Sequence, residues 1–255
     1  MDWKAVFDEE RACVIVPTYN NERTIVDVLR RIGAYTRNVI VVNDGSTPAT
    51  MAALTAAFED SELPEIVDYM PNRGKGYALM QGFRRALALG YKYAITIDSD
   101  GQHFPEDIPA VMDCHLSNQD ALVVGSRNLT ADNMPSKNTF ANKFSNFWFR
   151  LQTGIPLEDT QSGYRLYPLE RLNLRWPITP RYEAELELLV YSAWRGVPVV
   201  SVPVRVYYPP EGERVSHFRP FWDFFRISVL NTVLTFSALL YYLPVKLWRR
   251  LTMRG

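Results

Sequence analysis

Residues 93–103 read YAITIDSDGQH. The first five residues are apolar or β-branched and predict a buried strand, and the polar run after them predicts the turn that ends it. Asp98 and Asp100 stand one residue apart, so an extended backbone points both carboxylates to the same side. Two such charges repel unless a cation or a proton lies between them, and oxygen ligands suit a hard divalent ion. A solvated Asp-rich turn explains this motif equally well when it is taken alone.

The rest of the N-terminal half repeats this pattern of an apolar run followed by a polar turn. Further buried strands are predicted at 12–16, 39–42 and 121–124, with a short one near 66–67. Helical spacing of apolar residues lies between them at 25–32, 48–58 and 79–87. This alternation predicts an α/β fold, a mostly parallel sheet with helices on both faces. Ligands of such sheets bind beyond the carboxyl ends of the strands, so the polar turns are expected on one rim.

Composition limits the class of protein. The chain has 255 residues, enough for one large domain with an appendage, and a formal net charge of +0, which argues against a nucleic-acid partner. Cys13 and Cys114 are the two cysteines, and we expect both to be thiols in a reducing compartment. The N-terminus is acidic at residues 8–10 and does not read as a signal peptide.

The second half of the chain is richer in aromatic residues. Residues 138–153 predict an amphipathic helix with Phe144 and Phe147 on one stripe. Such a helix packs on the domain or lies at a bilayer surface, and both interpretations stand. Residues 182–194 predict another helix, and 197–206 one or two strands. We expect residues 1–215 to form the α/β domain, with the amphipathic helix at 138–153 as part of it.

Residues 216–255 predict a membrane-associated helical segment. Residues 227–245 contain no charged residue, and a helix of that length rises ~28 Å, close to the thickness of a bilayer core. Basic residues flank both ends, so a single span would place one basic end outside. We therefore favour an interfacial or re-entrant arrangement, broken near Pro244, with both ends cytoplasmic. A buried helix of a soluble protein is the alternative.

The order of six motifs resembles the family-two inverting glycosyltransferases, in particular the dolichol- or polyprenyl-phosphate sugar synthases. The motifs are VPTYNNE at 16–22, VNDGS at 42–46, NRGKG at 72–76, DSDGQH at 98–103, GSR at 125–127 and DTQSGYR at 159–165. The resemblance implies the GT-A fold, a Rossmann-like α/β domain with a nucleotide-sugar and metal site on one rim.

The resemblance also implies roles for residues on that rim. Asp98 and Asp100 are the expected ligands of Mg²⁺ or Mn²⁺. Expected contacts to the donor come from Pro17, Tyr19, Glu22, Asp44, Arg73, Lys75 and Asp98. Expected contacts to the acceptor or its phosphate come from Arg127, Lys143, Gln161 and Ser162. The expected catalytic residues are Gln102 near the metal, Asp159 as the candidate base and Arg165 as a phosphate-binding guanidinium.

Three departures from the family pattern concern Asn43, the pair Asn142-Lys143, and Ser201. The last two touch the acceptor side. We therefore expect transfer of one sugar from a UDP- or GDP-linked donor to polyprenyl phosphate, with a lipid hydroxyl as the alternative acceptor. An inactive membrane scaffold is the alternative from a different class. The expected location is the cytoplasmic face of a membrane, such as the bacterial inner membrane, and a homo-oligomer is left open.

Overall fold

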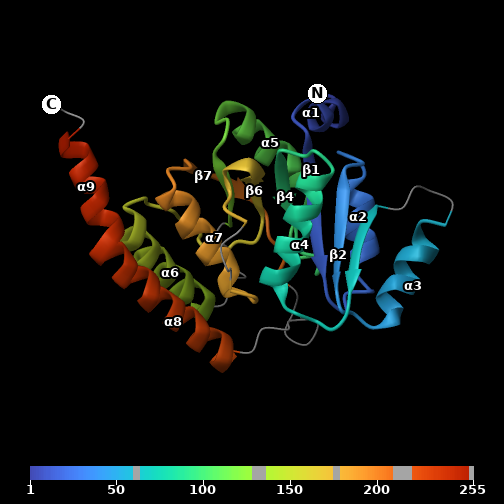
Figure 1. Cartoon of the computed structure of the whole chain (residues 1–255). Coiled ribbons are helices and arrows are strands. Elements are labelled where there is room, and N and C mark those ends of the chain that lie inside the picture. The colour runs from blue at the N-terminus through green and yellow to red at the C-terminus, as the bar shows by residue number, and fades with distance from the viewer. Residues whose placement is uncertain (60–63, 128–135, 175–178, 209–219, 253–255) are drawn as a thin grey trace.

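The computed structural model of the chain describes residues 1–59, 64–127, 136–174, 179–208 and 220–252. These residues form a seven-stranded sheet in the order β3-β2-β1-β4-β6-β5-β7 (Figure 1). The strands are β1 (Ala12–Thr18), β2 (Val39–Asp44), β3 (Glu65–Tyr69), β4 (Tyr93–Thr96), β5 (Leu122–Arg127), β6 (Arg165–Pro168) and β7 (Val199–Val204).

Nine α-helices are formed by the described residues. They are α1 (Trp3–Glu9), α2 (Ile25–Ile32), α3 (Pro48–Ala57), α4 (Lys75–Ala88), α5 (Ile108–Ser117), α6 (Ser136–Thr153), α7 (Glu183–Trp194), α8 (Pro220–Ser237) and α9 (Leu243–Thr252). The expected alternation of strands and helices is confirmed up to β5.

Strand β1 shows why helices cover both faces of the sheet. All seven of its residues are buried, and neighbouring residues point to opposite faces. Cys13 and Ile15 lie in a core with residues of α4 and α7, whereas Val14 and Val16 lie in a second core with residues of α2 and α5. A continuous apolar run is the pattern that a strand buried on both faces requires.

Strand β6 is the one strand of the described sheet that runs antiparallel, against both β4 and β5. The sequence predicts no strand here: Arg165 belongs to the motif at 159–165, and four residues are too short a pattern to recognise as a strand. Since β6 runs backwards, it begins at the rim where its neighbours end. The loop before it, residues 158–164, therefore enters the rim beside β5.

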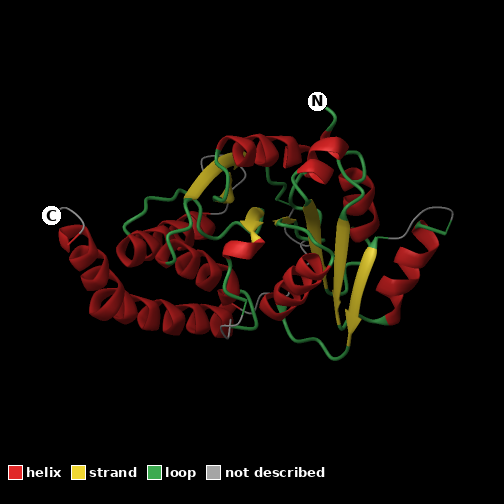
Figure 2. Ribbon diagram, turned by 45° about the horizontal axis from the view of Figure 1, so that its top comes forward, coloured by secondary structure: helices red, strands yellow, loops and turns green. Residues whose placement is uncertain are grey.

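Helices α6, α7 and α8 gather beyond the β7 side of the sheet, far from α3, in both views (Figures 1 and 2). Leu230, Leu234 and Ala238 of the C-terminal segment are buried. Gln152 Nε2 of α6 donates to Asn231 Oδ1 and to Thr235 Oγ1 of α8, both at 3.1 Å. Helix α8 is thus fastened to the rest of the protein along one face.

The α-helical pattern of the C-terminal segment is interrupted just before Pro244, near the expected break, although the chain stays helical. Proline lacks the N–H that would bond to a carbonyl four residues earlier. A π-helical turn at Ala238–Tyr242 precedes it, and α9 continues through the proline. The expected domain boundary between residues 215 and 216 lies outside the described residues.

Candidate active site

The carboxyl ends of β1, β2 and β4 meet at one rim, as the alternation of elements predicts. Residues 98–103, which follow β4, form the acidic turn. The turn after β1 is joined to it by Asn21, whose Nδ2 donates to Ser99 Oγ at 2.8 Å. Thr24 Oγ1 donates to the Ser99 carbonyl at 2.6 Å. Asn20 N donates to Ser46 Oγ after β2 at 3.0 Å. These bonds fix three loops from distant parts of the sequence as one surface.

Asp98 shares an ammonium with a glutamate from another element. Lys75 Nζ lies 2.8 Å from Asp98 Oδ1 and 3.0 Å from Asp98 Oδ2. The same Nζ lies 3.1 Å from Glu185 Oε2 of α7. Burial opposes ionisation of Asp98, but the charge and hydrogen bond of Lys75, together with the nearby His103 and Arg127, outweigh it, so the pKa of this carboxyl lies below its usual value. The pKa of Lys75 lies above its usual value, so its side chain is protonated. Burial lowers this pKa, but the two carboxylates together raise it by more.

Asp100 is the carboxyl of the acidic pair whose ionisation its surroundings oppose. Burial, and then the charge of Asp98, raise the pKa of Asp100 to about 6. Its Oδ1 accepts a hydrogen bond from Gln102 N at 3.0 Å. A divalent cation at this turn would relieve the repulsion between the two carboxylates.

The residues at this turn fit a metal that is shared with a ligand. Among the described residues, no group of three or more His, Cys, Asp or Glu could hold a metal ion by itself. Two carboxylates leave most coordination positions to water and to phosphate oxygens, which is how Mg²⁺ is usually bound.

Asp44 holds the loop that carries the basic residues. Its Oδ1 accepts from Arg73 N at 2.7 Å, and its Oδ2 accepts from Gly74 N at 2.8 Å. Asn72 Nδ2 donates to the same Oδ2 at 2.8 Å. Gly45 has a φ of +67°, and a Cβ there would collide with the Asn72 backbone. Asp44 therefore shapes the loop at residues 72–74, and a bond to a base or ribose would be additional.

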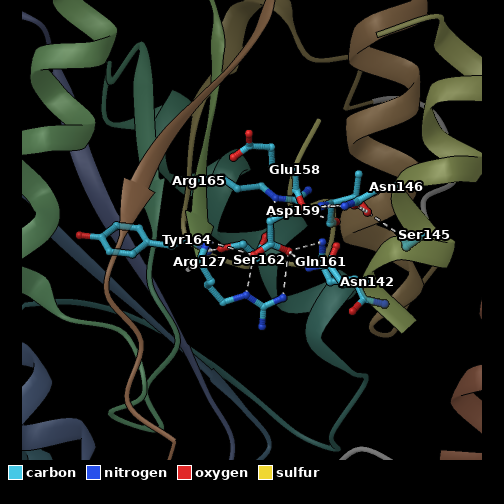
Figure 3. Close-up of polar contacts among 11 residues, drawn as sticks. Arg127, Asn142, Ser145, Asn146, Glu158, Asp159, Gln161, Ser162, Tyr164 and Arg165 are labelled. Carbon is cyan, nitrogen blue, oxygen red and sulfur yellow. Dashed lines mark hydrogen bonds and ion pairs between the residues drawn. The ribbon is translucent and has the colours of Figure 1, made fainter. Parts of the chain in front are cut away.

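Asp159 lies at the centre of a separate hydrogen-bond cluster (Figure 3). Arg127 Nε donates to Asp159 Oδ2 at 2.6 Å, and Arg127 Nη2 donates to Asp159 Oδ1 at 2.9 Å. Asn142 Nδ2, from α6, donates to the same Oδ1 at 2.7 Å. The backbone N–H groups of Arg127 and Gln161 add two more bonds. The cluster joins the end of β5, α6 and the loop before β6.

This environment is unfavourable for a general base. Asp159 is fully buried. Burial raises the pKa of Asp159, but the hydrogen bonds and charge of Arg127 outweigh that effect and lower it. A carboxylate with five donors and a lowered pKa accepts a proton poorly. The geometry instead assigns Asp159 the task of orienting Arg127, whose side chain is 18% exposed.

Arg165 does not reach the rim as a phosphate-binding group. Its side chain is fully buried. Its Nε donates to the Ser162 carbonyl at 2.7 Å, Nη2 to the Thr160 carbonyl at 2.8 Å, and Nη1 to the Glu185 carbonyl at 2.5 Å. The N–H groups of its guanidinium thus donate to backbone carbonyls, and Arg165 links the loop at residues 160–162 to α7. Sequence reasoning could not separate this role from phosphate binding, since both use a guanidinium.

The other expected residues fall in four environments. Pro17 and Ser162 are buried, and Ser162 Oγ accepts from Tyr164 N at 3.3 Å. Arg73 lies over the ring of Tyr77, with 4.8 Å from its guanidinium carbon to the ring centroid. Tyr19, Glu22 and Gln102 are half-buried, whereas Lys143 and Gln161 are exposed.

Two contributors were missed by sequence reasoning. Asn142 was read only as a departure from the family pattern, yet it donates to Asp159. Glu185 was read only as one residue of a helix, yet it contacts Lys75. A spacing of 110 residues separates Lys75 from Glu185, and no local pattern reports such a contact.

Comparison with known proteins identifies the family. Residues 13–167, more than half of the chain, match glycosyl transferase family 2. The chain therefore belongs to this family of glycosyltransferases. The match covers the strands from β1 to β6, and with them the acidic turn, the basic loop and the Asp159 cluster.

Curated relatives share this region at moderate identity. Polyprenol monophosphomannose synthase of Mycolicibacterium smegmatis is 29% identical over 204 residues, covering 76% of this chain and 77% of the relative. Undecaprenyl-phosphate mannosyltransferase of Micrococcus luteus is also 29% identical, over 76% of this chain and 82% of the relative.

A solved structure has the same fold. Glucosyl-3-phosphoglycerate synthase of Mycobacterium tuberculosis, in complex with Mn²⁺, UDP and phosphoglyceric acid, aligns with a TM-score of 0.65 and 20% identity. The alignment covers 92% of this chain and 81% of that one. The predicted GT-A architecture is thus confirmed.

Proposed function

We propose that this protein transfers a single sugar, with inversion, from a nucleotide-diphosphate sugar to polyprenyl phosphate at a membrane surface. The observation that carries the proposal is that two distinct groups lie near each other, since the charge of Arg127 helps to lower the pKa of Asp98. One group, at the acidic end, has the crowded carboxylates Asp98 and Asp100. The other, at the opposite end, has Arg127 held by the buried Asp159. The names of the two relatives, which include a polyprenol and an undecaprenyl-phosphate transferase, support the acceptor.

The acidic end suits the leaving diphosphate. Asp98 and Asp100 would hold Mg²⁺ or Mn²⁺, and the bound metal would supply charge stabilisation to the departing phosphate oxygens. The Mn²⁺ and UDP in the complex of the synthase with the same fold support this choice. Lys75, 2.8 Å from Asp98, would add a positive charge near the same phosphates. Asp44 keeps the 72–74 loop in place to receive the nucleotide.

The opposite end suits an anionic acceptor. Arg127 lies where β5 ends, and its guanidinium is orientated by Asp159 through two hydrogen bonds. An oxygen of the acceptor phosphate would attack the anomeric carbon while the bond to the diphosphate breaks, and the nucleotide would leave with that electron pair. A phosphate anion needs no deprotonation at neutral pH. The lack of a suitable base at Asp159 therefore favours a phosphate over a hydroxyl acceptor.

We propose further that helices α8 and α9 lie in a membrane surface. Among the described residues, one helical stretch, Trp222–Trp248, is long and apolar enough to cross a membrane, and 22% of its most apolar window is buried. Its exposed apolar side chains include Trp222, Phe225, Val229, Val233, Phe236, Leu240 and Trp248. A contiguous apolar surface of this kind marks an interaction site.

The docked face of this stretch favours an in-plane orientation. Asn231 and Thr235 bond to Gln152 of α6, so the helix cannot leave the domain without exposing these polar contacts to lipid. Lys143, Arg150 and Arg226 are exposed and supply positive charge for anionic headgroups. An interfacial position at the cytoplasmic face would bring the acceptor phosphate to the rim.

The decisive experiment is a donor panel. Release of UDP or GDP is measured with and without undecaprenyl phosphate, in Mg²⁺, in Mn²⁺ and in EDTA. We expect turnover that needs polyprenyl phosphate, stops in EDTA and is lost in Asp100→Asn. Equal nucleotide release without the lipid phosphate would refute the acceptor assignment, and full activity in EDTA would refute the metal.

Membrane binding is tested by vesicle flotation. We expect Leu240→Glu combined with Trp248→Glu to lose binding to anionic vesicles, because two charges would enter the apolar face. Leu89→Glu is the matched control, since Leu89 is an exposed apolar residue that follows α4, away from this face. Equal flotation of all three proteins would contradict the in-plane assignment.

A further inference from the structure

The cluster of Lys75, Asp98 and Glu185 contains one cation between two anions. The Lys75 ammonium lies 2.8 Å from Asp98 and 3.1 Å from Glu185. The side chains of Lys75 and Glu185 are 15% and 10% exposed, and that of Asp98 is 27% exposed. The open side of the cluster is thus the side of Asp98, where the acidic turn faces the rim.

The backbone of Gly163 closes the cluster from another side. A Cβ added at Gly163 would lie 2.9 Å from Glu185 Oε1, 2.9 Å from Lys75 Nζ and 3.1 Å from Asp98 Oδ2. A single added carbon would therefore press on all three charged groups at once. The loop before β6 keeps them together, and the ammonium has little room to move except between its two carboxylate partners.

Both oxygens of Asp98 are within hydrogen-bonding distance of the same ammonium. A metal ion arriving at Asp98 meets a carboxylate that is already neutralised, and a divalent ion and an ammonium repel each other. Lys75 must therefore give up part of its contact with Asp98 when a metal binds. Its charge then needs another buried partner, since an unpaired buried ammonium is strongly unfavourable.

Glu185 can supply that partner without rearrangement of the fold. Its Oε2 already contacts Lys75. Its Oε1 is buried and has no hydrogen-bond partner among the described residues, so this carboxylate has spare capacity for a second N–H bond. Packing alone does not explain why Glu185 Oε1, a buried acceptor without a partner among the described residues, lies beside Lys75.

We infer that Glu185 is a positioning residue of the metal site. When a metal binds, Glu185 becomes the main ion-pair partner of Lys75 and so leaves Asp98 free to ligate the metal. The inference rests on the metal dependence in the proposed function. Glu185 touches neither metal nor substrate in this role. It acts through Lys75, and its effect on metal binding should vanish when Lys75 is removed.

A double-mutant cycle on Mn²⁺ binding tests the inference. Mn²⁺ affinity of the full chain is measured by calorimetry or electron paramagnetic resonance, with Mn²⁺ alone and with Mn²⁺ plus UDP or GDP. We expect Glu185→Gln to weaken Mn²⁺ binding about tenfold, because Lys75 is then left with Asp98 alone. Lys75→Met should strengthen binding of Mn²⁺ alone, and Glu185→Gln should change affinity less than twofold in that background.

The controls separate this role from simpler ones. Glu187→Gln, on the same helix, should leave Mn²⁺ affinity unchanged, since Glu187 accepts from Thr179 N instead of contacting Lys75. If Glu185→Gln fails to fold, Glu185→Asp takes its place in the cycle. The shorter side chain keeps the negative charge but moves it away from Lys75, so we expect a smaller loss of Mn²⁺ affinity.

Two results would overturn the inference while the proposed function survives. An equal loss from Glu185→Gln with and without Lys75 would mean that Glu185 attracts the metal directly. No loss in either background would mean that Glu185 is irrelevant to the metal. Failure of the wild type to bind Mn²⁺ even with nucleotide would instead refute the metal dependence, and this inference with it.

Discussion

Replacing Asp100 by asparagine is expected to stabilise the metal-free protein while abolishing its turnover. Asparagine has nearly the same shape, and its Oδ1 can still accept the hydrogen bond from Gln102 N. The substitution removes the one carboxylate of the acidic turn whose ionisation the fold opposes. The pKa of Asp100 rises from an ordinary 3.8 to about 6 through burial and the charge of Asp98.

The size of the effect follows from proton linkage. The pKa rises by about two, and each pKa unit is worth about 1.4 kcal/mol, so ionised Asp100 costs the fold at most about 3 kcal/mol. Because partial solvation reduces this figure, we expect a gain of about 1–3 kcal/mol for Asp100→Asn at pH 8. In a domain of this size that corresponds to a rise in melting temperature of about 3–10 °C.

The stability advantage of Asp100→Asn over the wild type should depend on pH. Folded Asp100 binds its proton more tightly than the unfolded chain does, so the wild type gains stability as pH falls from about 6 towards 4. The advantage of Asp100→Asn is therefore full at pH 8 and falls to about half at pH 5. Melting is followed by circular dichroism in EDTA at both values.

Asp98→Asn is the matched control, with the opposite sign. Burial raises the pKa of Asp98, but Lys75, His103 and Arg127 together outweigh it and lower the pKa, so the charge of Asp98 stabilises the fold above its unfolded pKa. Asp98→Asn should lower the melting temperature at pH 8. If Asp100→Asn is no more stable than the wild type at pH 8, or is equally favoured at both pH values, the electrostatic account of the acidic turn is wrong.

Three further predictions concern the remaining polar groups. Asp159→Asn should destabilise the protein by about 2–4 kcal/mol in chemical denaturation, because it unpairs the partly buried Arg127. It should also lower turnover without removing the acidic limb of the pH–rate profile. Loss of that limb would show that Asp159 acts as a base. Asp44→Asn should weaken UDP or GDP binding about tenfold in calorimetry, since an amide cannot accept all the bonds from Arg73 N and Gly74 N, and unchanged affinity would contradict the role in the loop. Arg165→Met should cost about 3 kcal/mol or more of stability yet leave the KM for polyprenyl phosphate of the folded fraction unchanged, whereas a large rise in that KM would place Arg165 at the phosphate.

The fold could be predicted largely from local pattern. Apolar runs such as residues 12–16 and 39–42 alternate with helical spacing, and this is enough to specify a sheet covered on both faces. The GT-A class needed the order of the six motifs as well. The antiparallel strand β6 was missed, because its direction is decided by pairing with β4 and β5 and not by its four residues.

The site was only partly accessible in the same way. Carboxylates and cations that follow strands can be found in a sequence, and Asp98, Lys75 and Arg127 were found so. Their partners could not be, since hydrogen bonds between distant elements leave no mark on local spacing. Arg165 shows the limit clearly: its motif matched the family, but burial turned its guanidinium towards the backbone.

By itself, the sequence determined the family, the alternating architecture and the two carboxylates that face the rim. These depend on residue type and on periodicity, which are local properties of a chain. Only the tertiary structure decided which charge meets which: Lys75 lies between Asp98 and Glu185, and Asp159 holds Arg127. Electrostatic energies depend on distance and burial, and both are set when remote segments pack together.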